Sequence, residues 1–336
     1  MKRLVVVLCL FFGSLQAQIL NVEPAFPTQN DVITIIYDAT QGNGALQGVA
    51  SVFAHTGVIT DQSSSSSDWQ FVRGNWGTND PSVAMTNLGN NLFEITIDIP
   101  NFYDFPAGTV VERLAFVFRN TNGSVVGRAS DGGDIFYEIY PANAGFLGKF
   151  FAPESFVLTN PNEPVGLVAK TNQNADLAII QNGQTIAQAN NTDILTHTFI
   201  ESTPGSYWVK FIGNTSTETV EDSTLIIINE APNIQDPPQG LIFGLNRITP
   251  DSVIYKFYAP EKDNVYLIGD FNDWIPTSDY QLNLSEDLTT WWIPLGNLTP
   301  GVRYGYQYLV DNQPFADPLS ELIADPANDA AIPLHI

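Results

Sequence analysis

The sequence predicts an all-β protein built from three consecutive β-sandwich domains. Its apolar segments alternate with polar residues at period two or form short β-branched runs, as strands do. Asn-Gly, Asp-Gly, proline and serine-rich turns separate them at intervals of roughly 10–20 residues, which is typical of sandwiches. The chain has 336 residues, enough for three sandwiches of ~100 residues each.

The first part of the chain carries the strand pattern most clearly. Leu92–Ile99 alternates without a break, so one face is expected in a core and the other in solvent. Asn122-Gly123 and Asn182-Gly183 are expected at hairpin tips, because glycine tolerates a positive φ angle. The other strands expected here are Val32–Tyr37, Leu114–Arg119 and Ile135–Tyr140.

The N-terminus has the pattern of a secretory signal peptide. Lys2 and Arg3 precede an apolar run over 4–12, and a short polar stretch follows, with cleavage expected near Ala17 or Gln18. The apolar run is too short to span a bilayer, which needs ~20 residues. Cys9 is the single cysteine and lies in this run, so the mature secreted protein is expected to form no disulfide.

Turn-forming and proline-rich stretches divide the rest of the chain. The Pro-rich stretch 232–240 is expected to be a stiff interdomain linker. The predicted organisation is a signal peptide (1–18), an N-terminal sandwich (19–140), a sandwich that acts as a spacer (141–231), the linker (232–240) and a third sandwich (241–336).

Charge and residue content exclude several functions. The formal net charge is −23, and no cluster of bases occurs beyond the first residues, which argues against nucleic acid and anionic membranes as partners. His55, His197 and His335 lie in different blocks, and no Ser-nucleophile elbow or zinc spacing accompanies them. The chain is therefore expected to be non-catalytic and to hold no cofactor. Calcium at 131–134 is conceivable, but a simple turn is the better interpretation.

The third block carries the most specific motif. Gly269-Asp270-Phe271-Asn272-Asp273-Trp274 follows a strand, and Tyr304–Asn312 and Asp317-Pro318 come later. This combination resembles the early-set, immunoglobulin-like domain in front of the catalytic barrel of α-amylase-family enzymes (glycoside hydrolase family 13), and related domains of glycogen-binding subunits.

This resemblance implies carbohydrate contacts at the motif. Trp274 would offer a flat apolar ring to a glucose unit, and Asn272 would shape the turn and contact the sugar. The alternative is that Trp274 packs against a neighbouring catalytic barrel. The stretch 324–333 resembles the connector that leads into that barrel in secreted bacterial α-amylases, so the chain is expected to be the front part of a longer hydrolase.

The first block also resembles a module of such enzymes. It contains His55–Val58, Trp69, Gly74–Gly77 and, later, Phe116–Asn120 with Asn122-Gly123. This set resembles the N-terminal modules of secreted amylase-type enzymes from Bacteroidetes-like bacteria, which are compared with starch-binding sandwiches. Trp69 and Trp76 lie in a polar, loop-rich stretch and are expected to bracket an α-glucan, unless one of them caps the sandwich. His55 could bind a sugar hydroxyl, although a satisfied turn histidine is the simpler interpretation.

The remaining tryptophans are expected to be structural or ambiguous. Trp208 is predicted in the core of the second block. Trp291 and Trp292 alternate on a strand, so one should face the core and the other a sugar or a covering domain.

These observations lead to one functional hypothesis and two alternatives. The chain is expected to be the secreted, non-catalytic N-terminal part of an α-amylase-family glycoside hydrolase that binds starch-like α-glucan or malto-oligosaccharide and supports a C-terminal catalytic domain. The alternatives are a free-standing secreted glycan-binding protein and an adhesive or structural array of immunoglobulin-like domains.

Overall fold

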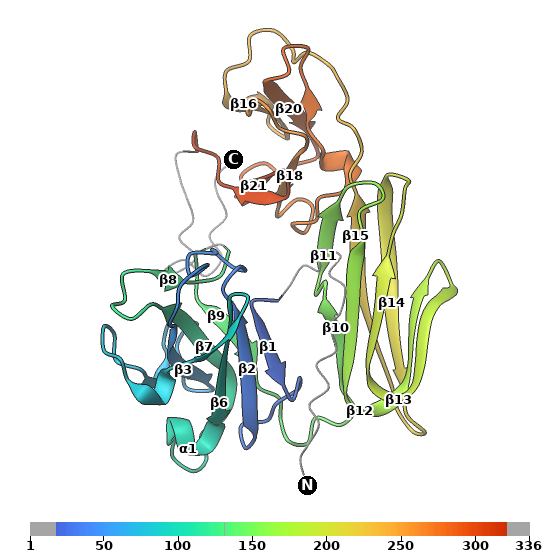
Figure 1. The fold of residues 1–336 in the computed structure, drawn as a ribbon. Helices are drawn as coiled ribbons and strands as arrows, with labels where there is room; N and C mark the ends of the chain where they lie inside the picture. The colour runs from blue at the N-terminus through green and yellow to red at the C-terminus, as the bar shows by residue number, and fades with distance from the viewer. Residues whose placement is uncertain (1–17, 131, 321–336) are drawn as a thin grey trace.

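The computed structural model describes residues 18–130 and 132–320 and confirms the all-β prediction. Its strands form three groups, seen at the lower left, the right and the top of Figure 1. Helix in the described residues is limited to α1 (Ile99–Tyr103) and the 3-10 turns η1 (Pro81–Val83) and η2 (Ser278–Tyr280). The predicted signal sequence, apart from Gln18, and the predicted connector at 324–333 lie outside the described residues.

Two sheets enclose the core of the first sandwich. One has the order β1-β2-β6-β5, and the other has β4-β3-β7-β8 with β9 paired to β7. The strands are β1 (Leu20–Glu23), β2 (Val32–Asp38), β3 (Phe53–Thr60), β4 (Gln70–Arg73), β5 (Thr86–Gly89), β6 (Leu92–Asp98), β7 (Val111–Arg119), β8 (Val126–Gly127) and β9 (Ile135–Glu138).

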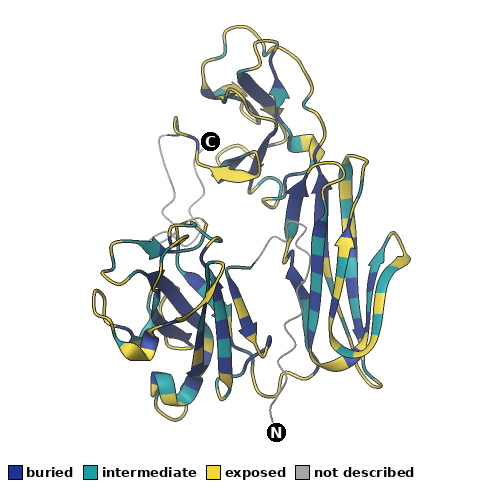
Figure 2. Cartoon of the chain, in the orientation of Figure 1, coloured by how far each residue is buried: buried dark blue, intermediate teal, exposed yellow. Residues whose placement is uncertain are grey.

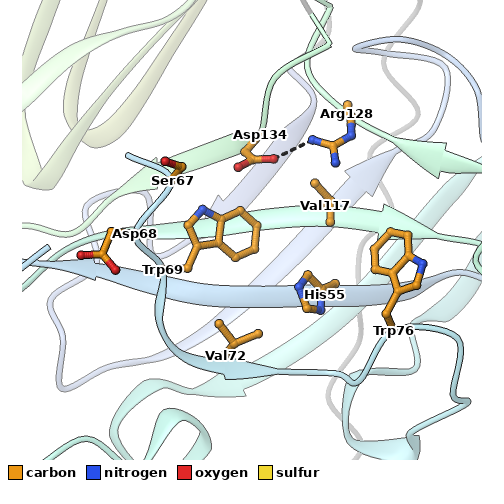
Figure 3. Close-up of a pocket in the computed structure, with 9 residues that line it drawn as sticks. All are labelled: His55, Ser67, Asp68, Trp69, Val72, Trp76, Val117, Arg128 and Asp134. Atoms are coloured by element: carbon orange, nitrogen blue, oxygen red, sulfur yellow. Dashed lines mark hydrogen bonds and ion pairs between the residues drawn. The ribbon is translucent and has the colours of Figure 1, made fainter. Parts of the chain in front are cut away.

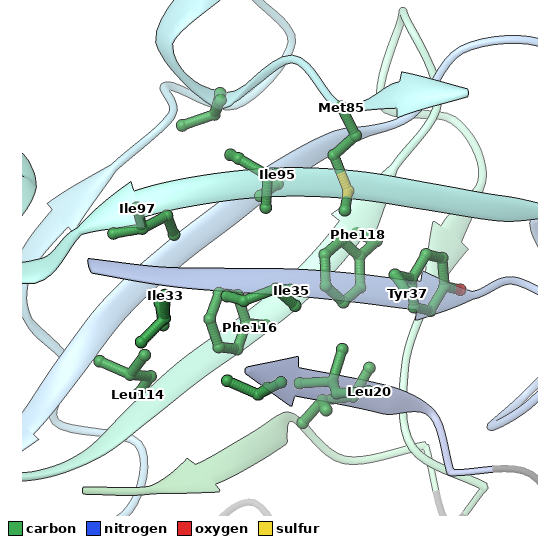
Figure 4. Packing of buried hydrophobic residues seen from close by; sticks show 14 of the residues in the cluster. Leu20, Ile33, Ile35, Tyr37, Met85, Ile95, Ile97, Leu114, Phe116 and Phe118 are labelled. Atoms are coloured by element: carbon green, nitrogen blue, oxygen red, sulfur yellow. The ribbon is translucent and has the colours of Figure 1, made fainter. Parts of the chain in front are cut away.

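Strand alternation decides which side chains fill this core. On β7, Leu114, Phe116 and Phe118 point inward and are fully buried (Figure 4). Tyr37 of β2 stacks on Phe118 with ring centroids 4.0 Å apart. The intervening β7 residues, among them Val117, consequently face the outer side of the sheet.

The second region is one bent sheet whose long strand serves two layers. Residues 168–171 of β12 pair with β10, and residues 176–181 pair with β14. Register shifts lie between these halves, and Leu167 and Leu177 from the two halves share one core with Phe150 and Phe211. The strands are β10 (Gly148–Ala152), β11 (Phe156–Thr159), β12 (Val165–Gln181), β13 (Gln184–Phe199), β14 (Gly205–Asn214) and β15 (Thr219–Ile228).

Trp208 is not a core residue, contrary to the sequence prediction. It is 58% exposed on β14, whereas Val209 and Phe211 are buried. Side chains alternate along a strand, so Trp208 shares its face with Lys210 and not with the core residues. Figure 2 shows this mixed burial along the sheet. Asn182-Gly183 forms the β12–β13 tip, where both residues have positive φ, as predicted.

The third sandwich again has two sheets around one core. Their orders are β16-β17-β20-β19 and β18-β21-β22, and Trp291 is fully buried between them. The strands are β16 (Gly244–Thr249), β17 (Ser252–Tyr258), β18 (Val265–Gly269), β19 (Asn283–Leu284), β20 (Thr290–Leu295), β21 (Tyr306–Val310) and β22 (Gln313–Phe315).

Trp292 faces neither a sugar nor an open surface. It points away from the core, as alternation with Trp291 requires, yet it is only 6% exposed. Its Nε1 donates a hydrogen bond to the Gln235 carbonyl oxygen at 2.7 Å. The backbone of Asn233 and Gln235 bonds to Leu284 of β19, so the Pro-rich stretch itself covers this indole.

Apolar contacts join the three regions. Phe26 of the first packs on Phe151 of the second with centroids 5.3 Å apart. Leu225 and Ile227 of the second pack with Tyr266 of the third, whose hydroxyl donates to Asn229 Oδ1 at 3.1 Å. None of the helices among the described residues is long and apolar enough to cross a membrane.

Candidate carbohydrate-binding site

A pocket of about 570 Å³ lies on the outer face of the β4-β3-β7-β8 sheet. Its floor is a cross-strand pair, His55 of β3 opposite Val117 of β7. Both residues point away from the core, because the core residues Ala54 and Phe116 precede them on their strands. The lining residues are His55, Ser67, Asp68, Trp69, Val72, Trp76, Val117, Arg128 and Asp134.

Two indole rings flank His55 in this pocket. The imidazole stacks against Trp69 with centroids 5.7 Å apart, and it lies perpendicular to the Trp76 ring with centroids 5.5 Å apart. Figure 3 shows the two indoles on either side of the histidine. Trp69 is half-buried, and Trp76 is 48% exposed. The fold thus brings His55 together with the two tryptophans that the sequence analysis had paired without it.

Gly57 allows Trp69 to lie close to the sheet. A Cβ atom at Gly57 would be 3.0 Å from the Gln70 carbonyl oxygen and 3.2 Å from Trp69 Cβ. The neighbouring residue of β4, Phe71, has a positive φ, and the β3–β4 register shifts here. The close approach of β4 therefore depends on the missing side chain at position 57.

A hydrogen bond sets the tautomer of His55. Its Nδ1 lies 2.6 Å from the carbonyl oxygen of Gly74. A carbonyl can only accept, so Nδ1 carries the hydrogen and donates it. This leaves Nε2 as the ring nitrogen that can meet a ligand. His55 is on a strand, so the interpretation as a turn histidine is wrong, although its Nδ1 is satisfied.

Charged and polar groups form the rim of the pocket. Arg128 and Asp134 make an ion pair of 2.7 Å. The Asp68 carboxylate accepts hydrogen bonds from the Ser64 N–H and hydroxyl, which lower its pKa below the ordinary aspartate value. Trp69 Nε1 is buried and finds no hydrogen-bond partner among the described residues. The lining therefore combines aromatic and aliphatic side chains with charged and polar groups.

Trp274 and Asn272 lie elsewhere, on the turn after β18 in the third sandwich. Trp274 is 40% exposed, and its Nε1 donates to Asp270 Oδ1 at 3.0 Å. The Asn272 side chain accepts from the Gly269 N–H at 2.8 Å and donates to the Leu267 carbonyl at 3.0 Å. Its amide is therefore used at both ends within the turn, which agrees with the turn-shaping role expected of it.

Some pocket residues were not predicted. Val117 lies within the predicted strand Leu114–Arg119, but only the structure shows that its outer side is a pocket floor. The sequence did not link Arg128 and Asp134 to the tryptophans. Both lie more than 50 residues further along the chain than Trp76, and only the fold places them in the same pocket. Among the described residues no group of three or more His, Asp or Glu side chains could hold a metal ion, and Asp131 lies outside them.

Comparisons with known proteins give a family model and distant structural neighbours. A model described as a domain of unknown function, DUF8578, matches residues 20–126, the segment with His55, Trp69 and Trp76. No curated protein matches this sequence.

The solved structures are similar in parts only. Fibronectin(III)-like modules of Clostridium thermocellum CbhA are 18% identical, with a TM-score of 0.22 over 24% of this chain and 95% of that one. An apo β-glucuronidase 3 of Bacteroides uniformis is 8% identical, with a TM-score of 0.24 over 58% of this chain and 27% of that one. A tandem of titin immunoglobulin domains is 12% identical, with a TM-score of 0.22 over 49% and 88%.

Proposed function

We propose that the first sandwich binds a neutral glycan in the pocket between Trp69 and Trp76. The observation that supports this most is the arrangement of two indoles around the His55 imidazole in one pocket. Indole faces suit the C–H faces of a sugar ring, and His55 Nε2 and the rim groups suit its hydroxyls.

The free energy of binding a sugar requires contacts with more than one aromatic ring. Covering ~100 Å² of one indole contributes roughly 2.5 kcal/mol at ~25 cal/mol/Å². Association costs at least ~4 kcal/mol in lost motional freedom. A single exposed tryptophan therefore binds a sugar very weakly, whereas two indoles and an imidazole in one pocket can exceed that cost.

The charge of the chain favours a neutral ligand. Acidic residues outnumber basic ones 36 to 13, and the pocket rim contains Asp68 and Asp134 beside Arg128. An acidic polysaccharide would be repelled by this field, whereas an α-glucan is indifferent to it.

We further propose the setting that the third-block motif implies. The chain would be the secreted, non-catalytic N-terminal part of an α-amylase-family glycoside hydrolase, holding starch-like α-glucan near a C-terminal catalytic domain. A reading frame that continues past residue 336 into such a domain supports this setting, and a stop codon there in independent isolates contradicts it.

Affinity electrophoresis tests the binding proposal. The protein is run in native gels with and without soluble starch, together with Trp76→Ala and Trp208→Ala. Trp208 is the matched control, because it is an exposed strand tryptophan that does not line this pocket. Retardation by starch that is lost only in Trp76→Ala supports the proposal. Equal mobility in both gels contradicts it and favours the adhesive or structural alternative.

A further inference from the structure

Arg119 is a buried arginine next to the pocket. It is the last residue of β7, two positions beyond Val117 on the same outer face, and its exposed fraction is 0%. Its guanidinium lies over the Phe53 ring, 5.1 Å from the centroid. Burying a charge is costly unless hydrogen bonds compensate for the lost hydration.

The hydrogen bonds of Arg119 reach two separate loops. Nη2 donates to the carbonyl oxygens of Asn75 and Thr78, on either side of Trp76. Nη1 donates to the carbonyl oxygen of Asn120 at 3.1 Å and to that of Thr121 at 3.5 Å. All four acceptors are backbone groups, so the guanidinium ties the two loops together whatever their side chains are.

These two loops enclose Trp76. A Cβ atom at Gly123, in the turn that follows Asn120, would be 3.1 Å from Trp76 Nε1. The indole also lies perpendicular to the His55 ring, with centroids 5.5 Å apart. A large ring that is 48% exposed keeps one orientation only if the backbone on both sides of it is held.

We propose that Arg119 is a positioning residue for the glycan pocket, holding Trp76 in its place beside His55. This inference rests on the proposed function, because it assigns Arg119 a role in ligand binding and not only in folding. Lysine at position 119 would keep the charge but has one nitrogen, which cannot serve the four carbonyls of the two loops.

The test compares Arg119→Lys with Arg113→Lys. Arg113 is on the same face of β7 and lies over Phe136 at 4.8 Å, but it does not line the pocket. The indole N–H signals are recorded by two-dimensional NMR without ligand, with Trp76 assigned through Trp76→Phe. We expect Arg119→Lys to shift or broaden the Trp76 signal and to weaken binding of maltoheptaose roughly tenfold, and Arg113→Lys to change neither.

The outcomes separate this inference from the proposed function. If the wild-type protein does not bind maltoheptaose, the proposed function fails, and the binding role of Arg119 fails with it. If the wild-type protein binds but Arg119→Lys leaves the Trp76 signal or the affinity unchanged, only this inference is overturned. Should Arg119→Lys not fold, Phe53→Leu removes the ring under the guanidinium and keeps its hydrogen bonds; a smaller change in the same direction supports the inference, and none contradicts it.

Discussion

The Trp76 pocket in the first sandwich and the Trp274 turn in the third use their polar groups differently. In the turn, Trp274 Nε1 bonds to Asp270 and the Asn272 amide bonds at both ends to nearby backbone. In the pocket, His55 uses Nδ1 for a backbone hydrogen bond, which leaves Nε2 as the ring nitrogen that can bind a ligand. The turn is thus self-satisfied, while the pocket offers groups to a ligand.

The turn is therefore easy to recognise in the sequence but has few polar groups left for a ligand, whereas the pocket has such groups but no compact motif. The turn motif is compact in sequence because its residues bond to one another over a few positions. The pocket residues come from β3, β4, β7 and the loops around them. A binding site needs groups that the fold does not consume, and such groups leave a weaker local pattern.

The largest expected change is the loss of glucan affinity when a tryptophan of the pocket is removed. Trp76→Ala should weaken α-glucan binding by about 2.5 kcal/mol, or roughly 60-fold, because it removes ~100 Å² of apolar contact. Isothermal titration with maltoheptaose measures this change. A loss below threefold would show that the ligand does not lie on this ring, and Trp208→Ala is the control for an exposed indole.

Asn272→Ala should affect stability and not binding. It removes two hydrogen bonds that hold the turn after β18, at a cost of about 2 kcal/mol in the free energy of unfolding. Urea unfolding followed by tryptophan fluorescence measures this cost. Lost glucan binding with unchanged stability would instead make Asn272 a ligand contact and remove the contrast between the two regions.

Gly57→Ala tests whether the close approach of β4 places Trp69. The added methyl group would press on Gln70 and Trp69, so we expect about 1 kcal/mol of destabilisation and a several-fold loss of affinity. Thermal unfolding and titration measure the two effects. Gly296→Ala is the control, because nothing lies within 4 Å of a Cβ atom there; equal behaviour of the two variants would be evidence against this role.

The smallest effect is expected at the turn tryptophan. Trp274→Ala should change starch retardation less than twofold, because one exposed ring gives less than the ~4 kcal/mol that association costs. Gels with graded starch concentrations measure this effect. A loss as large as that of Trp76→Ala would place a second glucan site in the third sandwich.

Period-two alternation explains how much could be predicted. Leu92–Ile99 and Leu114–Arg119 were predicted as strands and form most of β6 and β7. For Trp208 the same alternation was misread, although Lys210 on its face indicates an outer surface. For Trp292 alternation correctly predicted a side chain that points away from the core. The Pro-rich stretch that covers this indole could not be predicted, because it is distant in sequence.

The sequence alone determined the all-β class, the Asn182-Gly183 hairpin tip and the choice of His55, Trp69 and Trp76 as candidate binding residues. These depend on neighbours along the chain, where a period of two and glycine's access to positive φ act locally. Only the tertiary structure decided that His55, Trp69 and Trp76 meet on one face and that Arg119 ties the loops around them. The physical reason is that hydrogen bonds and ring contacts across a sheet depend on register and loop closure, which local patterns do not encode.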